Sequence, residues 1–184
     1  MKLLTIDTET TGLSPRLHKV LSIGLLIVDV NKSNLKILGQ DHLLIRHKSY
    51  NADPKALAVN KIDLKEHDRI AIDAENACEK LNTFVRKNSL QKTPLLGHNI
   101  AFDKEFLSSL FEDQKMPCFL HEECLDTMHF WNYLKKRNLV PSYLRSNLKT
   151  IANFFKVDYS NAHSAIADCY ITAKIYQKML AFSN

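Results

Sequence analysis

The chain has 184 residues, 45% of them hydrophobic, which suits one well-packed domain over residues 1–184 and excludes two domains of ordinary size. Lys and Arg number 25 against 20 Asp and Glu, and the net charge of +5 is compatible with a polyanionic partner without requiring one. The four cysteines form no C-x-x-C pair and are too few for a secreted disulfide scaffold, so we expect reduced thiols and a cytoplasmic protein.

Segments rich in Ile, Leu and Val open the chain, and we expect three strands, Leu3 to Thr8, Val20 to Val30 and Leu35 to Ile45. The short connection from Asn31 to Asn34 predicts that these strands form an antiparallel meander. After a polar stretch around Asp53 and Pro54, apolar residues recur at helical spacing from about Asp73 to Lys87.

Strands and helices alternate in the second half of the chain. Strands are expected at Thr93 to Gly97 and near Cys124 to Leu125, and helices at Ala101 to about Glu112, Thr127 to Lys136 and about Ser164 to Ala181. Ser146 can cap a further helix that carries Leu148, Ile151 and Phe155. The order predicts an α/β fold with a mixed five-stranded sheet, in which two parallel strands extend the meander, flanked by helices.

Asp7 and Glu9 stand two residues apart at the end of the first expected strand. The period of two in a strand directs both side chains to the same face, where like charges repel unless a cation lies between them. For a lone D-x-E the simpler interpretation is that the strand has ended and both side chains face water.

Two aspartates interrupt apolar helix faces. At 100° per residue, Asp103 falls in the middle of the apolar arc formed between Phe102 and Phe111, and Asp168 falls inside the apolar arc of the last helix. Burial of an unpaired charge is costly, so such groups are normally paired, protonated or bound to metal. A salt bridge or a local cap is the alternative for Asp103, but two such helices and a strand ending in D-x-E together indicate one acidic pocket.

His163 lies five residues before Asp168, where the last helix should begin. An imidazole there can take a proton from water near neutral pH, although a solvent-exposed histidine is the simpler alternative. Four converging carboxylates are stable only with cations, and two Mg²⁺ ions about 3.5 to 4 Å apart, with Mn²⁺ as a substitute, are suited to phosphodiester cleavage. One ion would activate the attacking water, the other would stabilise the leaving 3′ oxygen, and His163 would be the general base.

Three motifs resemble those of a known family: D-T-E-T-T-G-L at Asp7 to Leu13, G-H-N-I-A-F-D at Gly97 to Asp103, and H-S-A-I-A-D at His163 to Asp168. They are similar to the motifs of the DEDDh (DnaQ-like) 3′-5′ exonucleases, a group that includes the proofreading epsilon subunit of bacterial DNA polymerase III. The histidine five residues before the last aspartate marks the His branch, whereas the sister branch has a tyrosine at the position of Ser164.

The resemblance implies the ribonuclease H-like fold and a set of roles. Asp7 would bind both metal ions, while Glu9, Asp103 and Asp168 would complete the ligand and water shell. The backbone around Thr8 and the side chains of Leu13, Asn99 and Phe102 would hold the terminal nucleotide, although Phe102 is equally compatible with a purely core role. Asp126 also has counterparts in the family, but we interpret it as the cap of the following helix and leave it out of the site.

The resemblance leaves the polymer open, because ribonucleases T, oligoribonucleases and proofreading subunits share this site. We expect release of nucleoside 5′-monophosphates from single-stranded DNA in replication or repair, with an exoribonuclease acting on RNA ends as the alternative. A noncatalytic polymerase-associated scaffold is disfavoured because no metal ligand is missing. The last residues, Gln177 to Phe182, resemble the Q-x-x-L-x-F peptide that binds the bacterial sliding clamp, although their apolar positions also fit the face of the last helix.

Overall fold

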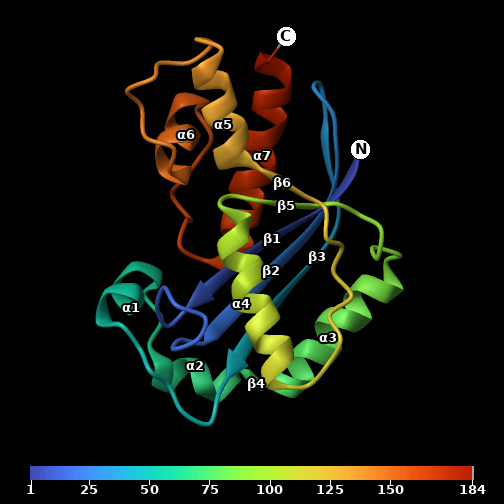
Figure 1. The fold of residues 1–184 in the computed structure, drawn as a ribbon, viewed down its shortest axis with the longest axis vertical. Helices are drawn as coiled ribbons and strands as arrows, with labels where there is room; N and C mark the ends of the chain where they lie inside the picture. The colour runs from blue at the N-terminus through green and yellow to red at the C-terminus, as the bar shows by residue number, and fades with distance from the viewer. Residues whose placement is uncertain (184) are drawn as a thin grey trace.

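The computed structural model describes residues 1–183, and three long strands form the middle of its sheet (Figure 1). They are β1 (Lys2–Thr10), β2 (Val20–Val30) and β3 (Leu35–Arg46). Each pairs antiparallel with the next, and the Asn31 side chain closes the turn between β2 and β3 by accepting hydrogen bonds from the Ser33 and Asn34 amides, both at 2.9 Å. The predicted meander is therefore confirmed.

The complete sheet has six strands, in the order β4-β3-β2-β1-β5-β6. Strands β5 (Leu95–Gly97) and β6 (Cys124–Asp126) extend it in parallel beyond β1, as predicted. The prediction of five strands was wrong by one, because β4 (Ile72–Asp73) pairs in parallel with the end of β3. Two residues are too short to show an alternating apolar pattern.

Two short helices were also missed, α1 (Pro54–Asn60) and α2 (Leu64–Ile70), in the stretch that follows β3. Asp53 caps α1 by accepting from the Lys55 amide, and Asp63 caps α2 by accepting from the Lys65 and Glu66 amides. Each helix has seven residues, which is too short for an apolar face to repeat clearly. The capping residues are the sequence signal that indicates these helices.

Helices cover both faces of the sheet (Figure 1). On one face, α3 (Ala74–Lys87) and α4 (Ile100–Asp113) pack against side chains that include Leu4 and Ile6 of β1. On the other face, α7 (Ala165–Phe182) packs against a group that includes Leu3. Strand β1 thus presents its even-numbered apolar residues to α4 and its odd-numbered ones to α7.

The helices α5 (Thr127–Lys136) and α6 (Leu148–Phe154) pack on α7 rather than on the sheet, around the fully buried Trp131. The cap of α6 is Asn147, whose side chain accepts from the Thr150 amide, so the assignment of that cap to Ser146 was wrong. The Ser146 hydroxyl instead donates to Asn132 at 2.6 Å.

Among residues 1–183, no helix combines the length and the apolar character needed to cross a membrane. The single-domain organisation of residues 1–184 stays a prediction, and Asn184 lies outside the described residues.

Candidate active site

The acidic residues of β1 lie on the face that α7 covers. Asp7 and Glu9 are both partly buried, and β1 continues through them before a register shift between Glu9 and Thr10. The alternative that the strand ends before these residues is therefore wrong. Oxygen atoms of Asp7, Glu9 and Asp168 all lie within 4.8 Å of one another, so the two strand carboxylates and one from α7 form a single group.

Asp168 reaches this group because the start of α7 approaches the sheet unusually closely. Gly24 of β2 lies opposite Asp7, and a Cβ atom on it would stand 2.4 Å from the carbonyl carbon and oxygen of Ala165. A side chain at position 24 would force the helix away from the sheet. The missing side chain therefore allows Asp168, one turn into α7, to lie beside the β1 carboxylates.

Asp103 comes from the opposite face of the sheet, in the first turn of α4. It is only 3% exposed, and its Oδ1 accepts hydrogen bonds from the Thr8 amide at 2.8 Å and the Thr8 hydroxyl at 2.7 Å. The burial expected from the apolar arc is confirmed. The partner of Asp103 is Thr8, between the two acidic residues of β1, and not a basic residue.

The electrostatics of the four carboxyl groups favour protonation in the absence of a cation. Burial, and then the charges of Asp103, Asp168 and Glu9, raise the pKa of Asp7 well above its usual value. Burial and the neighbouring aspartates raise the pKa of Glu9 to about 7. Burial raises the pKa of Asp103 to about 7 against the lowering effect of Thr8, and burial also raises the pKa of Asp168. The amide and the charge of His163 lower the pKa of Asp168 and partly offset the effect of its burial.

The donor set fits a hard divalent cation. One oxygen of Asp168, Oδ1, is buried and has no hydrogen-bond partner among the described residues. Carboxylate oxygens are the ligands that Mg²⁺ and Mn²⁺ prefer, and an ion among Asp7, Glu9 and Asp168 would neutralise them and satisfy the unpaired oxygen. Asp103 is not part of the group within 4.8 Å, and Thr8 donates both of its hydrogen bonds to Oδ1 of this residue.

His163 lies beside this group at the start of α7. Its backbone amide donates to Asp168 Oδ2 at 3.3 Å, and its φ of 75° is a left-handed conformation that turns the chain sharply into the helix. The side chain is exposed, and its ring meets the ring of Tyr159 edge to face, with centroids 5.9 Å apart. The imidazole can therefore reach the carboxylates while staying in contact with solvent.

Two neighbours of the site were missed by sequence reasoning. Tyr159 lies close enough for Asp168, Asp7 and Glu9, after burial itself, to raise the pKa of its phenol. The buried Asn60 of α1 donates to the Thr10 carbonyl at 3.1 Å and also forms a hydrogen bond that lowers the pKa of Glu9. Neither residue belongs to a motif quoted above. The one signal in the sequence for Tyr159 is its position four residues before His163.

The residues expected to hold a nucleotide differ in their surroundings. Leu13 is 78% exposed, and Asn99 is exposed with a left-handed φ of 61° and no capping hydrogen bond from its side chain. Phe102 is half-buried and packs against Phe106, with ring centroids 4.8 Å apart. Both donors of Thr8 are taken by Asp103, so Thr8 acts on the site through that contact.

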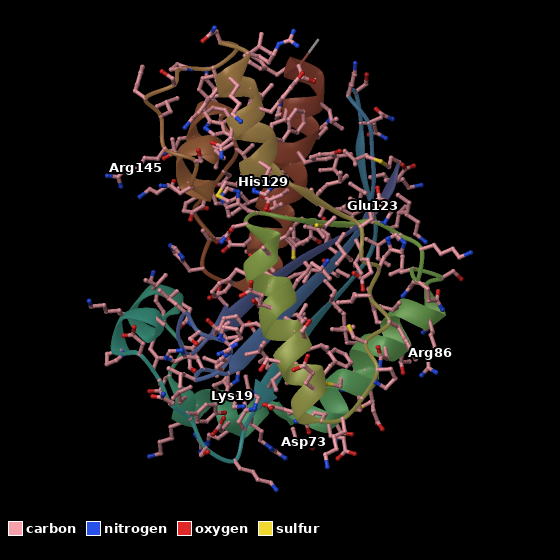
Figure 2. All side chains as sticks on the ribbon, in the orientation of Figure 1. Lys19, Asp73, Arg86, Glu123, His129 and Arg145 are labelled. Atoms are coloured by element: carbon pink, nitrogen blue, oxygen red, sulfur yellow. The ribbon has the colours of Figure 1, made fainter. Side chains whose placement is uncertain are left out.

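A groove of about 790 Å³ opens beside Asp168. Its walls come from the residues after β5, the start of α5, the segment before α6 with the first turn of α6, the loop before α7 and the first turn of α7. They include Asn99, Arg145, Lys149, Tyr159 and Asp168. Arg145 extends from the loop after α5 to the outer surface (Figure 2). The groove thus joins the acidic group to exposed positive charge.

Comparison with known proteins gives a consistent result. A family model described as Exonuclease (RNase_T) matches residues 4–176. The chain is 28% identical over 172 residues to a PolC-type DNA polymerase III from Mycoplasmopsis pulmonis, covering 92% of this chain and 11% of that protein. It is 28% identical to ribonuclease T of Buchnera aphidicola subsp. Baizongia pistaciae, covering 96% of this chain and 82% of the relative. For the oligoribonuclease of Buchnera aphidicola subsp. Acyrthosiphon pisum the identity is 26%, and the coverage is 96% and 92%.

Solved structures show the same fold. Exonuclease I of Escherichia coli, in complex with a dT13 oligonucleotide, superposes with a TM-score of 0.79 at 19% identity, over 96% of this chain and 40% of that chain. The fold is thus ribonuclease H-like, as predicted, with one strand more. The chain spans less than half of exonuclease I and about a tenth of the PolC-type polymerase.

Proposed function

The chain belongs to the exonuclease family, and from this premise we propose that it is a metal-dependent 3′-5′ exonuclease that releases nucleoside 5′-monophosphates from single-stranded DNA. The observation that carries the proposal is the group of Asp7, Glu9 and Asp168, whose oxygens lie within 4.8 Å of one another and whose burial and repulsion raise the pKa of Asp7 well above its usual value. Such a group is costly to maintain unless a cation binds it.

Two divalent ions, Mg²⁺ with Mn²⁺ as a substitute, are assigned to Asp7, Glu9, Asp103 and Asp168. When bound, they supply positive charge that lowers the pKa of the attacking water and stabilises the leaving 3′ oxygen. The protein supplies the ligands from three elements, and the contact between Thr8 and Asp103 joins two of them. Asp168 contributes a buried oxygen that has no hydrogen-bond partner within residues 1–183.

His163 is assigned as the general base. Its exposed ring can accept a proton from the attacking water and release it to solvent, and its ring contact with Tyr159 limits the orientations it can adopt. The backbone bond from His163 to Asp168 fixes the distance between the base and the carboxylate group.

The strand is assigned to the groove beside Asp168. Leu13, Asn99 and Phe102 would contact the terminal nucleotide, with Leu13 offering an exposed apolar surface for a base. Arg145 and Lys149 would contact phosphates further along the strand, because both are exposed cations on the groove wall.

RNA is the second candidate polymer. It is supported by the ribonuclease T and the oligoribonuclease, both of which the chain matches over most of their length. DNA is supported by the match to about a tenth of a PolC-type DNA polymerase III, 11% of its length, and by the first of the three motifs. A noncatalytic scaffold lacks support, since all four carboxylates are present and buried or partly buried.

One assay tests these assignments. 5′-labelled single-stranded DNA and RNA of the same sequence are incubated with the protein in Mg²⁺ or EDTA, beside an Asp7→Ala variant. We expect a ladder of shortened DNA that requires Mg²⁺ and Asp7. A ladder on RNA alone would identify RNA as the substrate in place of DNA. The absence of a metal-dependent ladder on both polymers would refute the proposal that the protein is an exonuclease.

Clamp binding through Gln177 to Phe182 is not part of the proposed function. In the structure this segment is the end of α7, where Met179 is fully buried and Phe182 contacts the rings of Phe154 and Phe155. The clamp-binding conformation would require the last turns of the helix to unwind and lose those contacts. A clamp pull-down with and without the last eight residues tests the motif, and equal recovery would remove it.

A further inference from the structure

Helix α4, which carries Asp103, has no cap of its own. Asn99 precedes the helix in a left-handed conformation, and its side chain makes no capping hydrogen bond. The first amides of a helix need acceptors from elsewhere. Here the acceptor is Asp126, at the end of β6, whose Oδ1 accepts from the Asn99 amide at 3.0 Å and whose Oδ2 accepts from the Ile100 amide at 3.1 Å.

The same carboxylate also caps α5. Asp126 Oδ1 accepts from the Met128 amide at 2.8 Å and from the His129 amide at 3.4 Å. This double role is possible because β5 and β6 are parallel neighbours, with Gly97 paired to Asp126, so both chains leave the sheet at the same edge. One side chain therefore organises the starts of two helices, at a distance of 26 residues along the chain for Ile100.

The start of α4 bears directly on the acidic group. Asp103 is three residues beyond Ile100, in the first turn, and its contact with Thr8 depends on where that turn begins. Asn99 lines the groove. Burial is the main cause that raises the pKa of Asp103 to about 7, and the charge of Asp126 adds to it, which agrees with the closeness of the two groups.

We propose that Asp126 is a positioning residue for the exonuclease reaction: by holding the Asn99 and Ile100 amides, it sets the start of α4 so that Asp103 meets β1 and Asn99 faces the groove. This inference rests on the proposed function and goes beyond it, because Asp126 is neither a member of the acidic group within 4.8 Å nor one of the residues that line the groove. The alternative is that Asp126 is only the cap of α5.

Asp126→Asn separates the two roles. An asparagine keeps one acceptor oxygen and caps a helix as well as an aspartate does, so the bond to Met128 can persist. Its second group becomes an N–H donor facing the Ile100 amide, which is also a donor, so the bond to Ile100 is lost, whereas the bond from the Asn99 amide to Oδ1 can persist. The cap of α5 and most of the stability should survive, while the start of α4 loses one of its two bonds to Asp126.

Asp73→Asn is the matched control. Asp73 caps α3 through Oδ1, which accepts from the Asn76 amide at 3.0 Å, and its Oδ2 accepts from the Asn76 side chain at 2.7 Å. The substitution thus keeps one capping bond and converts the second acceptor oxygen into an N–H donor, as it does at position 126. Figure 2 shows Asp73 at the opposite end of the molecule from His129, at the start of α5, and from Arg145.

The experiment measures three quantities for the wild type and both variants: kcat and KM on single-stranded oligonucleotide, the dissociation constant of Mn²⁺ by calorimetry, and amide hydrogen exchange in EDTA. For Asp126→Asn we expect kcat to fall at least about tenfold, Mn²⁺ to bind about tenfold more weakly, and exchange at Ile100 to accelerate while Met128 stays protected, effects of the size of one lost hydrogen bond to a charged group. Asp73→Asn should match the wild type in all three.

The outcomes are distinguishable. If the wild type cleaves and Asp126→Asn matches Asp73→Asn in kcat and Mn²⁺ binding, the positioning role is wrong and Asp126 is only a cap. Faster exchange at both Ile100 and Met128 would mean general loosening and would also overturn it. A wild type that neither cleaves nor binds Mn²⁺ would overturn the proposed function, and the positioning role with it.

Discussion

At the scale of single residues, the site is a concentration of carboxyl groups that the fold holds partly or fully buried. Burial and mutual repulsion raise the pKa values of Asp7 and Glu9, and burial raises those of Asp103 and Asp168. Hydrogen bonds from Thr8 lower the pKa of Asp103, and the amide and the charge of His163 lower that of Asp168. Groups with such values are common where a protein binds cations or moves protons. We therefore expect the stability and the activity of the protein to depend on pH and on divalent metal.

The stability of the metal-free protein should fall between pH 4.5 and about 7. Folded Glu9, with a pKa of about 7, keeps a proton in this range that unfolded Glu9, with a pKa of 4.5, has released. The folded state then binds more protons than the unfolded state, so the free energy of unfolding decreases as pH rises. In Glu9→Gln this contribution is absent. The Tm of the variant in EDTA, relative to that of the wild type, should therefore increase as the pH rises from 4.5 to about 7.

The control for this prediction is Mg²⁺. Above pH 7 the ion should raise the Tm of the wild type and raise that of Glu9→Gln by less, because the variant offers one ligand fewer. A difference in Tm between the two proteins that does not change with pH in EDTA would contradict the predicted role of Glu9.

Substitution of His163 should separate catalysis from metal binding. His163→Gln removes the base while leaving the backbone bond to Asp168 available, so we expect kcat to fall by about 10² to 10⁴ with the Mg²⁺ requirement unchanged. The measurement is kcat as a function of Mg²⁺ concentration. A variant with kcat within about tenfold of the wild type would exclude His163 as the general base.

At the scale of elements, the site depends on how closely two helices approach the sheet. Helix α7 comes to β2 at Gly24, where a Cβ would stand 2.4 Å from the backbone of Ala165, and α4 comes to β1 through the bonds between Thr8 and Asp103. The carboxylates from opposite faces of the sheet can meet only because both helices begin near the same end of β1. A shift of either helix by the size of one methyl group should therefore move a carboxylate and lower the activity.

Gly24→Ala tests the approach of α7. The added Cβ meets backbone atoms that cannot rotate away, so we expect a loss of about 1–3 kcal/mol in stability and a lower kcat, as Asp168 moves from Asp7. The control is Gly39→Ala on β3, whose Cβ would lie 3.3 Å from the flexible end of Ile27. Chemical denaturation and the exonuclease assay measure both effects, and equal activities of the two variants would refute the prediction.

At the scale of the whole molecule, the acidic group and the exposed cations lie at neighbouring places along one groove. Asp168 is on its wall, as are Arg145 from the segment between α5 and α6 and Lys149 from the first turn of α6. The net charge of +5 is small, and by itself it does not orient a nucleic-acid strand on the surface. Local arrangement of charge, rather than its total, therefore favours this path for a phosphate backbone.

Removal of the groove cations should weaken binding and its dependence on salt. For the double variant Arg145→Ala and Lys149→Ala we expect a higher KM for single-stranded oligonucleotide, a nearly unchanged kcat, and a slope of log KM against log salt reduced by roughly one per phosphate contact. Lys80→Ala with Lys87→Ala, on the wall of a different pocket, is the control. A salt slope equal to that of the control would exclude the groove as the strand path.

The sequence by itself determined the elements and the identity of the acidic residues. A helical period of 3.6 residues is a local property, so it revealed that Asp103 and Asp168 interrupt apolar faces, and both prove to be buried, at 3% and 8% exposure. The alternation of β1 likewise placed Asp7 and Glu9 on one face. Short elements were missed for the same reason, since the two residues of β4 and the seven of α1 contain too few periods for an apolar face to repeat.

Only the tertiary structure decided which atoms meet. Periodicity shows which side of an element faces inward, but not that Asp103 would reach Thr8 across 95 residues, or that Asp126 would cap a helix that begins before it in the chain. It also could not place Tyr159 against His163, or show that a missing side chain at Gly24 admits α7 to the sheet. These contacts depend on the packing of several elements at once, which is a property of the folded chain and not of any segment of it.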